Sequence, residues 1–403
     1  MTANQTARPA SRARDPRIDA VRGMALMGIL VVNLPFLAMP YGFAGASWRH
    51  ADTFYLGSFS AWFIQALFEN KFILIFAFLF GMGAAAQVSA NGARRFVFRM
   101  LLLGLLGVLN AVLVFEADIL LPYAVLGLLM LPLHRLRIQT LLSTALLFWI
   151  AAILGHALFA IYVATAEMGS GLSEEARIQL FSSGGFVAMA HQRALDWLVF
   201  SQMSIPAIWP MTMSAFCLGM AAFRLRIASA GDGFGSLERI ARVLLLPALL
   251  GNLAYGALCL APADWAGGHV FLATLVLRPV FAPMLSFVIF ALLFRLLERT
   301  PRLTDFFAAS GRMSLSIYML QGILGGFIFF GYGAGLYASL SLQAVLALAF
   351  LLFVLLALLA RLWLGRFRSG PFEALMAAAL TLTERRLSTP PAALRAGPRA
   401  APR

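Results

Sequence analysis

Apolar runs of about 20 residues recur along the whole chain, and short polar segments separate them. A helix of that length spans the hydrocarbon core of a bilayer. The pattern therefore predicts an all-α, polytopic integral membrane protein with about ten transmembrane helices. These are expected at residues 20–39, 71–89, 96–115, 119–134, 139–162, 204–224, 243–260, 269–294, 313–331 and 343–364.

Two of the predicted loops are long. The loop 40–70 contains a short apolar stretch, 54–68, which predicts a helix that lies at the membrane interface or dips into it as a half-helix. The loop 163–203 mixes apolar with charged residues over 175–200, and this mixture predicts an amphipathic helix on the outer surface.

The ends of the chain are polar. Residues 1–16 form a basic segment that is expected to be cytoplasmic, and residues 17–382 form the membrane domain. Residues 383–403 are rich in Arg, Pro and Ala, a composition that predicts a disordered cytoplasmic tail.

Composition narrows the class of protein. The chain is 61% hydrophobic and 12% charged, with a mean hydropathy of +0.86. A soluble domain carries about 25% charged residues, so soluble enzymes, disordered proteins and secreted disulfide scaffolds are excluded. The two cysteines, Cys217 and Cys259, lie in apolar runs, and we interpret both as small hydrophobic residues.

Charge predicts the orientation in the membrane. With an even number of spans, both termini lie on one side, and 26 of the 31 Lys and Arg residues fall on that side, four on the other and one within a span. Because cytoplasmic loops carry the excess of Lys and Arg, both termini are expected to be cytoplasmic. The positions of the arginines explain the net charge of +14 without nucleic acid, so no nucleic-acid partner is predicted.

The basic residue within a span is Arg278, about 13 Å from the predicted start of its helix. Pro279 and Pro283 follow it and free backbone carbonyls. An intramembrane charge indicates either a structural ion pair or a guanidinium that faces a buried anionic substrate. By depth, the expected partners are Asp118 and Glu116.

Several polar residues lie at the predicted outer face. Glu69 and Lys71 flank the start of one predicted helix. Glu116 is expected in a solvated turn, whereas the side chain of Asp118 is expected to point into the protein. His50 lies in the first outer loop. The spacing of the histidines matches no metal-ligand pattern, so no metal site is predicted.

Two stretches of sequence are more specific than the apolar pattern common to membrane proteins. They are RIDAVRGMA at 17–25 and GRMSLSIYMLQ at 311–321. Together with Asn70-Lys71-Phe72 and Asp118-Ile119-Leu120, they closely resemble the YeiB-like family of bacterial inner-membrane proteins, a domain of unknown function. The resemblance runs from about 17 to 382. It implies a multi-pass protein of the bacterial inner (cytoplasmic) membrane.

The beginning of the chain also resembles the transmembrane acyltransferase superfamily, through Asp19-x-x-Arg22-Gly23. Its members include the acyltransferase-three proteins and the lysosomal glucosaminide acetyltransferases, which move an acyl group from cytoplasmic acyl-CoA to an acceptor at the far side. Acyltransferase-three proteins have a histidine eleven residues after that arginine. This chain has Asn33 there, and in this it is similar to the glucosaminide enzymes.

This resemblance implies an inner-membrane acyltransferase-like protein with acyl-CoA as donor and an envelope lipid or glycan as acceptor. Asp19 would orient Arg22 toward a CoA phosphate, Asn33 would hold the thioester carbonyl, and Tyr318 and Gln321 would line the same cavity. The outer, catalytic end would comprise His50, Glu69, Lys71 and Asp118. Two alternatives stay open: a transporter or flippase that moves an amphiphile past Arg278, and a non-catalytic envelope partner.

Overall fold

The computed structural model describes residues 15–40, 56–165, 172–227, 231–260 and 269–388. Throughout this part of the chain the regular structure is helical, and no strand occurs in it. The predicted all-α class is confirmed. The described helices are α1 (Pro16–Ala38), α2 (Leu56–Leu67), α3 (Lys71–Leu113), α4 (Leu120–Leu129), the 3-10 helix η2 (Pro132–Arg135), α5 (Ile138–Thr165), α6 (Glu174–Ser183), α7 (Phe186–Arg224), α8 (Gly231–Cys259), α9 (His269–Arg299), α10 (Pro301–Arg312), α11 (Ser314–Phe329), α12 (Leu342–Arg366) and α13 (Pro371–Ser388).

The described helices are those of a membrane protein. Seven are long and apolar enough to cross a bilayer, or eight if α10 and α11, which meet at 78°, form one broken span. The number of ten stays a prediction. Two predicted spans, 71–89 and 96–115, are both part of α3, which Gly92 interrupts with a φ of 80°. Glycine adopts this conformation without the penalty that a Cβ brings.

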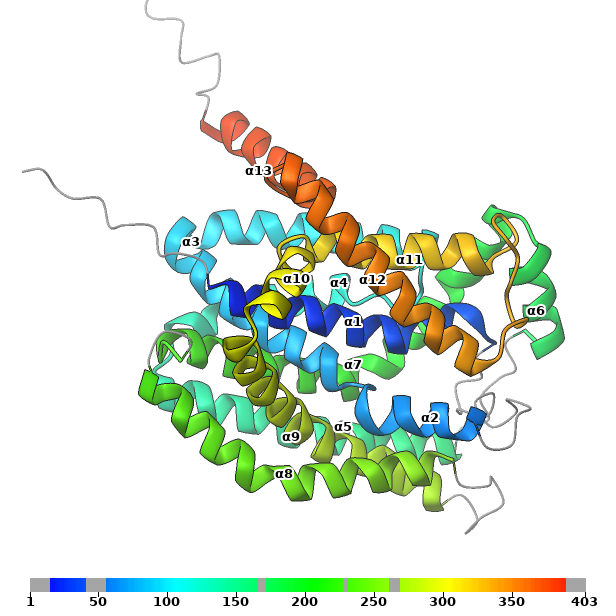
Figure 1. The fold of residues 1–403 in the computed structure, drawn as a ribbon, viewed down its shortest axis with the longest axis horizontal. Helices are drawn as coiled ribbons and strands as arrows, with labels where there is room; N and C mark the ends of the chain where they lie inside the picture. The colour runs from blue at the N-terminus through cyan, green and yellow to red at the C-terminus, as the bar shows by residue number, and fades with distance from the viewer. Residues whose placement is uncertain (1–14, 41–55, 166–171, 228–230, 261–268, 389–403) are drawn as a thin grey trace, which may run out of the picture.

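Helix α1 lies in the middle of the molecule and packs against α3, α9, α10, α11 and α12 (Figure 1). Its sequence is apolar on all sides, as expected for a helix that other helices surround. Where α1 crosses α10, Gly23 meets the backbone of Phe307 and Gly311 meets the backbone of Asp19, with no room for a Cβ. These glycines let the two backbones touch. As a result, the start of α1 is held firmly.

The predicted amphipathic helix at 175–200 is wrong in its bounds. The short α6 begins after Ser173, whose Oγ accepts a hydrogen bond from the amide of Ala176 at 3.2 Å. A second helix, α7, then begins at Phe186 and continues without a break through the predicted span 204–224. No Gly or Pro occurs between Phe186 and Ser204, and extending a helix costs less than starting a new one.

The outer stretch 54–68 does contain a helix, α2, which packs against α8. The indole Nε1 of Trp62 donates to the carbonyl of Leu253 at 3.3 Å and fixes this contact. The tail prediction, 383–403, lies largely outside the described residues, although α13 extends to Ser388.

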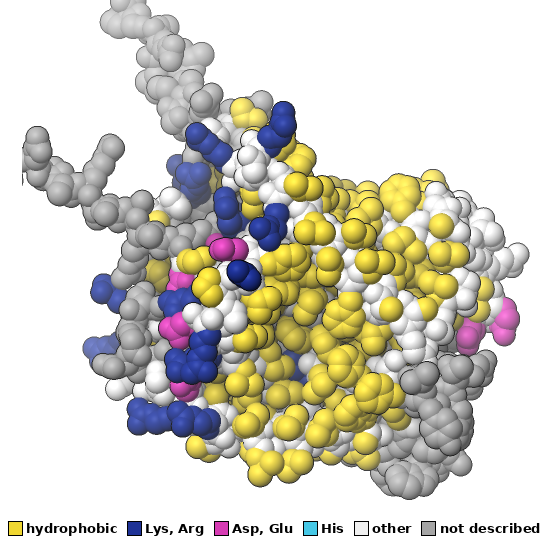
Figure 2. All heavy atoms as spheres, viewed as in Figure 1, with side chains coloured by type: hydrophobic (Ala, Val, Ile, Leu, Met, Phe, Trp, Pro, Cys, Tyr) yellow, Lys and Arg dark blue, Asp and Glu magenta, His cyan; other side chains and the backbone are white. Residues whose placement is uncertain are grey.

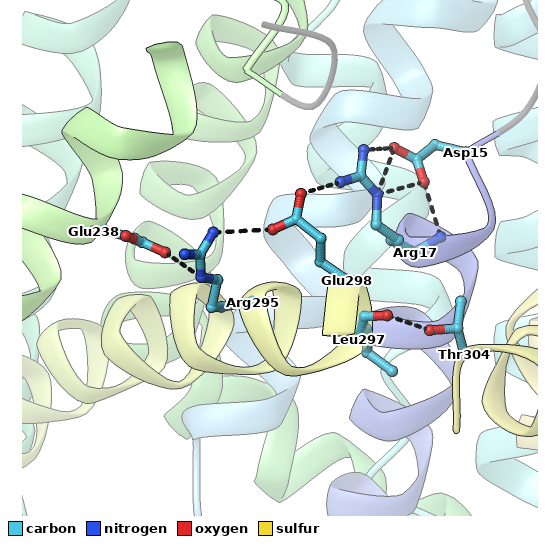
Figure 3. A network of polar contacts seen from close by, with 7 residues as sticks. All are labelled: Asp15, Arg17, Glu238, Arg295, Leu297, Glu298 and Thr304. Atoms are coloured by element: carbon cyan, nitrogen blue, oxygen red, sulfur yellow. Dashed lines mark hydrogen bonds and ion pairs between the residues drawn. The ribbon is translucent and has the colours of Figure 1, made fainter. Parts of the chain in front are cut away.

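Basic side chains gather at one end of the molecule, beside a broad apolar face (Figure 2). At that end, Arg17 bonds Asp15 at 2.8 Å and Glu298 at 3.3 Å, and Arg295 joins Glu298 to Glu238 (Figure 3). This network ties the start of α1 to α8 and α9.

Candidate functional site

Asp118 lies between α3 and α4 and is almost fully buried, with 2% of its surface exposed. Its carboxylate accepts hydrogen bonds from Asn110 Nδ2 at 2.8 Å and from the backbone amide of Leu121 at 2.9 Å. The hydroxyl of Tyr318 lies 3.4 Å from Asp118 Oδ1 and accepts a bond from the amide of Ile119 at 3.3 Å. The hydroxyl proton of Tyr318 therefore points to the carboxylate of Asp118. This contact joins α11 to the connection between α3 and α4.

Burial dominates the electrostatics of this carboxyl group. Desolvation raises the pKa of Asp118 to about 7, although the hydrogen bonds from Leu121 and Asn110 act in the opposite direction. The residue precedes α4 and is outside the candidate spans. A carboxyl group that changes protonation near neutral pH is suited to general acid–base chemistry.

Beside the hydrogen-bond partners of Asp118 is a narrow cavity, about large enough for one water molecule. It is lined by Leu30, Asn33, Leu37, Asn110, Phe115, Tyr318, Gln321 and Gly322. The structure thus brings Asn33, Tyr318 and Gln321 to one cavity, where the amide Oδ1 of Asn110 is buried without a hydrogen-bond partner among the described residues. We name Asn33, Asn110, Asp118, Tyr318 and Gln321 the central cluster.

A basic edge lies at the N-terminal end of the same helix, α1. Arg22 Nη1 is 3.4 Å from Asp19 Oδ1, and the arginine side chain is 19% exposed. Arg99 of α3 lies close enough to interact electrostatically with Arg22. Eleven residues, or about 16 Å of helix, separate Arg22 from Asn33. Helix α1 therefore carries both the basic edge and one wall of the cavity.

A second buried group of polar residues surrounds Arg278. Its Nη1 is 3.1 Å from Glu69 Oε1, and Glu69 Oε2 accepts a hydrogen bond from the Tyr255 hydroxyl at 2.6 Å. Lys71 is completely buried, and its Nζ donates to the carbonyl of Gln65 at 2.7 Å. We name Gln65, Glu69, Lys71, Tyr255 and Arg278 the Arg278 cluster.

This second cluster corrects two predictions. The partner of Arg278 is Glu69, and not Asp118 or Glu116, because the turn between α2 and α3 brings Glu69 to α9. Glu69 and Lys71 therefore lie in the Arg278 cluster, while Asp118 belongs to the central cluster. The outer polar residues, predicted to act together, are divided between two clusters. His50 lies outside the described residues.

Glu116 is not a solvated turn residue. Its carboxylate is 3.4 Å from Arg177 Nη2, and Arg177 also binds Asp196 at 2.8 Å. Burial raises the pKa of Glu116, while the charge of Arg177 opposes this shift. The two ion pairs of Arg177 thus connect α6 and α7 to the end of α3.

Sequence reasoning missed Tyr255 and Arg193. Tyr255 had no visible signal, since a tyrosine in an apolar helix is ordinary. Arg193 is completely buried, donates to the carbonyl of Leu113 at 3.0 Å and lies 4.7 Å from the ring centre of Phe330. The sequence carries no clear signal for its burial, because His191, Gln192 and Asp196 beside it are typical of an amphipathic surface helix.

The histidines that the structure describes do not form a metal site. Among the described residues, no group of three or more His, Cys, Asp or Glu side chains could hold a metal ion. His156 is completely buried, and its Nδ1 lies 2.7 Å from the carbonyl oxygen of Ala152. Both cysteines are free.

The chain is similar in sequence to proteins of unknown function. Residues 222–382 match a family model described as a protein of unknown function, DUF418. The chain is 28% identical to the uncharacterized protein YxaH of Bacillus subtilis, over 91% of this chain and 94% of that protein. It is 26% identical to the uncharacterized protein YeiB of Escherichia coli, over 89% and 94% of the two chains. No solved structure matches the chain significantly.

Proposed function

Since this chain belongs to the YeiB-like family of membrane proteins, we propose that it is an acyltransferase-like protein that transfers an acyl group from cytoplasmic acyl-CoA to an envelope lipid or glycan. The proposal includes ten spans, both termini in the cytoplasm and a place in the bacterial inner membrane. In this orientation the edge with Arg22 faces the cytoplasm, where acyl-CoA is found.

The observation that carries the proposal is the cavity beside Asp118 and Tyr318. The side-chain amides of Asn33, Asn110 and Gln321 line it, and Asn110 binds the carboxyl group of Asp118, whose pKa is near 7. Acyl transfer needs a proton acceptor for the attacking hydroxyl and donors for the oxygen that becomes negative in the transition state. The central cluster contains both kinds of group within one small volume.

In the proposed reaction, the acceptor hydroxyl oxygen attacks the thioester carbonyl carbon and forms a new C–O bond. Its proton passes to the carboxylate of Asp118, and the amide of Asn33 or Asn110 donates to the carbonyl oxygen. The C–S bond then breaks, and the CoA thiolate takes the proton back from Asp118. The products are an ester and free CoA, and the enzyme returns to its starting state.

Arg22 would bind the donor by a phosphate group. A guanidinium forms paired hydrogen bonds with phosphate oxygens, and Asp19 orients that guanidinium from one helical turn away. About 16 Å of helix to Asn33 would then be spanned by the pantetheine arm of CoA, so that the thioester reaches the cavity.

The test is thermal unfolding of the purified protein with acetyl-CoA, a longer acyl-CoA and free CoA. Ligand at about 100 times its dissociation constant adds about 2.7 kcal/mol to the stability of the folded state. We expect CoA compounds to raise the melting temperature of the wild type and not that of Arg22→Ala. The control is Arg302→Ala, which removes an exposed arginine of α10. Cooperative melting without a shift for any CoA compound would contradict the proposal.

A further inference from the structure

We propose that Lys71 and Arg278 form a binding site for the anionic headgroup of a membrane amphiphile, which enters sideways from the bilayer. The inference deepens the proposed function and rests on it, because it assigns the place and the chemical class of the acceptor: a lipid with a phosphate or carboxylate group.

The first argument is the charge of the Arg278 cluster. It contains two basic side chains and one carboxylate, so its basic groups outnumber its acidic ones. A charge in this environment is costly unless it has a partner. Glu69 neutralises Arg278, and Tyr255 completes the hydrogen bonding of that carboxylate. The ammonium of Lys71 is left without a carboxylate within 4 Å among the described residues.

The second argument is the supply of hydrogen-bond donors. Lys71 Nζ makes one hydrogen bond to protein, with the Gln65 carbonyl, although an ammonium group has three donors. The buried Nε of Arg278 has no partner among the described residues. An oxyanion bound here would meet these unused donors.

The third argument is access. Arg278 and Glu69 keep 16% and 18% of their side-chain surface exposed, although apolar side chains surround them. Figure 2 shows a recess in the broad apolar face, over α2 and α9, with a basic side chain at its base. That face is the one that lipid would cover. A headgroup could therefore reach the guanidinium of Arg278 while its acyl chains stay in the bilayer, whereas the completely buried Lys71 has no exposed surface of its own.

The fourth argument is the connection to the central cluster. The hydroxyl of Tyr123, on α4, donates to the carbonyl of Ile73 at 2.9 Å. Ile73 is two residues from Lys71, and Tyr123 is five residues from Asp118. The two clusters thus lie against the same pair of helices, α3 and α4. An acceptor lipid held by Lys71 would lie on the side of α3 that leads to Asp118.

A purely structural role explains only part of the cluster. An ion pair that locks α9 to the α2–α3 turn needs Arg278 and Glu69 but not a second buried cation. Replacing Lys71 by an apolar residue would then be neutral or stabilising. Binding of an anion gives Lys71 a role, and the two explanations differ in their predictions.

The experiment measures the affinity of the full-length protein in neutral detergent for dioleoylphosphatidylglycerol. Zwitterionic dioleoylphosphatidylcholine and inorganic phosphate are measured in parallel, by native mass spectrometry and by thermal shift. The variants are Lys71→Met, Lys71→Arg and the double variant Glu69→Gln/Arg278→Gln, which removes the guanidinium without leaving a lone charge. Arg302→Gln, at the exposed basic end, is the control for unspecific attraction.

We expect the wild type, Lys71→Arg and Arg302→Gln to bind phosphatidylglycerol with similar affinity. Lys71→Met and the double variant should bind it at least tenfold more weakly. Equal shifts with inorganic phosphate would support the anion site and identify a free anion as its ligand. Unchanged affinity in Lys71→Met and in the double variant would overturn the proposal. A shift with acyl-CoA that Arg22→Ala abolishes would still be seen in that case, and would leave the proposed function intact.

Discussion

The central cluster and the Arg278 cluster use different chemistry. The central cluster has a single carboxyl group, and amides and a phenol surround it, so its charge depends on pH. The Arg278 cluster holds one carboxylate and two basic side chains, and an ion pair joins Arg278 to Glu69 in it. Both lie in a molecule whose other inner positions are mostly apolar.

The difference shows how a helical membrane protein can separate proton transfer from binding. A group that exchanges a proton must be easy to neutralise, and burial among neutral amides achieves this. A group that attracts an anion must stay charged, and a neighbouring carboxylate with a tyrosine keeps the guanidinium ionised. The proposed roles of the two clusters follow from this contrast.

The largest expected effect concerns Asp118. Asp118→Asn keeps the shape of the side chain and removes the proton acceptor, so acyl transfer should fall by about 100-fold or more. Stabilisation by acyl-CoA should persist, because Arg22 is unchanged. Transfer of a radiolabelled acyl group to membrane lipids measures the loss.

The matched control for this variant is Glu116→Gln, the same type of change two residues earlier, in the pair with Arg177. Its transfer rate should stay within a few-fold of the wild type. If Asp118→Asn were as active as this control, the central cluster would not be the site of proton transfer.

The next effect concerns the stability of the Arg278 cluster. Glu69→Gln leaves the guanidinium of Arg278 without its carboxylate, and breaking a buried ion pair in this way costs about 3 kcal/mol. Adding Arg278→Gln should recover much of that loss, because no lone charge is left. Equilibrium unfolding in mixed micelles measures both variants. A single variant as stable as the double variant would show that solvent screens this pair.

The most gradual effect is the pH dependence of stability. The pKa of Asp118 is about 7 in the folded protein and near 3.8 in the unfolded chain. Between these values the folded state holds a proton that the unfolded state has released. Stability therefore decreases as the pH rises from about 4 to about 7, by at most about 1.4 kcal/mol per pH unit, and then levels off.

Asp118→Asn should remove this part of the pH dependence. The quantity to compare is the difference in melting temperature between wild type and variant from pH 5 to pH 9. The wild type should lose stability relative to the variant up to about pH 7 and run parallel to it above. Parallel curves over the whole range would mean that Asp118 titrates as an exposed carboxyl group does.

Hydrophobic pattern alone predicted much of the fold. The spans expected at 20–39 and 343–364 correspond to α1 and α12, because an apolar run bounded by polar residues has few alternatives in a bilayer. The bend between α10 and α11 and the continuous α7 were not predicted. Pattern gives the length of an apolar run, but it does not say whether two helical segments share one axis.

The candidate site, like the fold, could be predicted from the sequence only in part. The hydrophobic pattern was enough to predict the class of protein, and the resemblance grouped Asn33 with Tyr318 and Gln321. The packing of the helices was needed to show that Glu69 is the partner of Arg278 and that Lys71 and Asp118 have different partners. Residue number sets the height of a side chain along its helix. The packing of the helices sets the direction in which that side chain points, and so its partner.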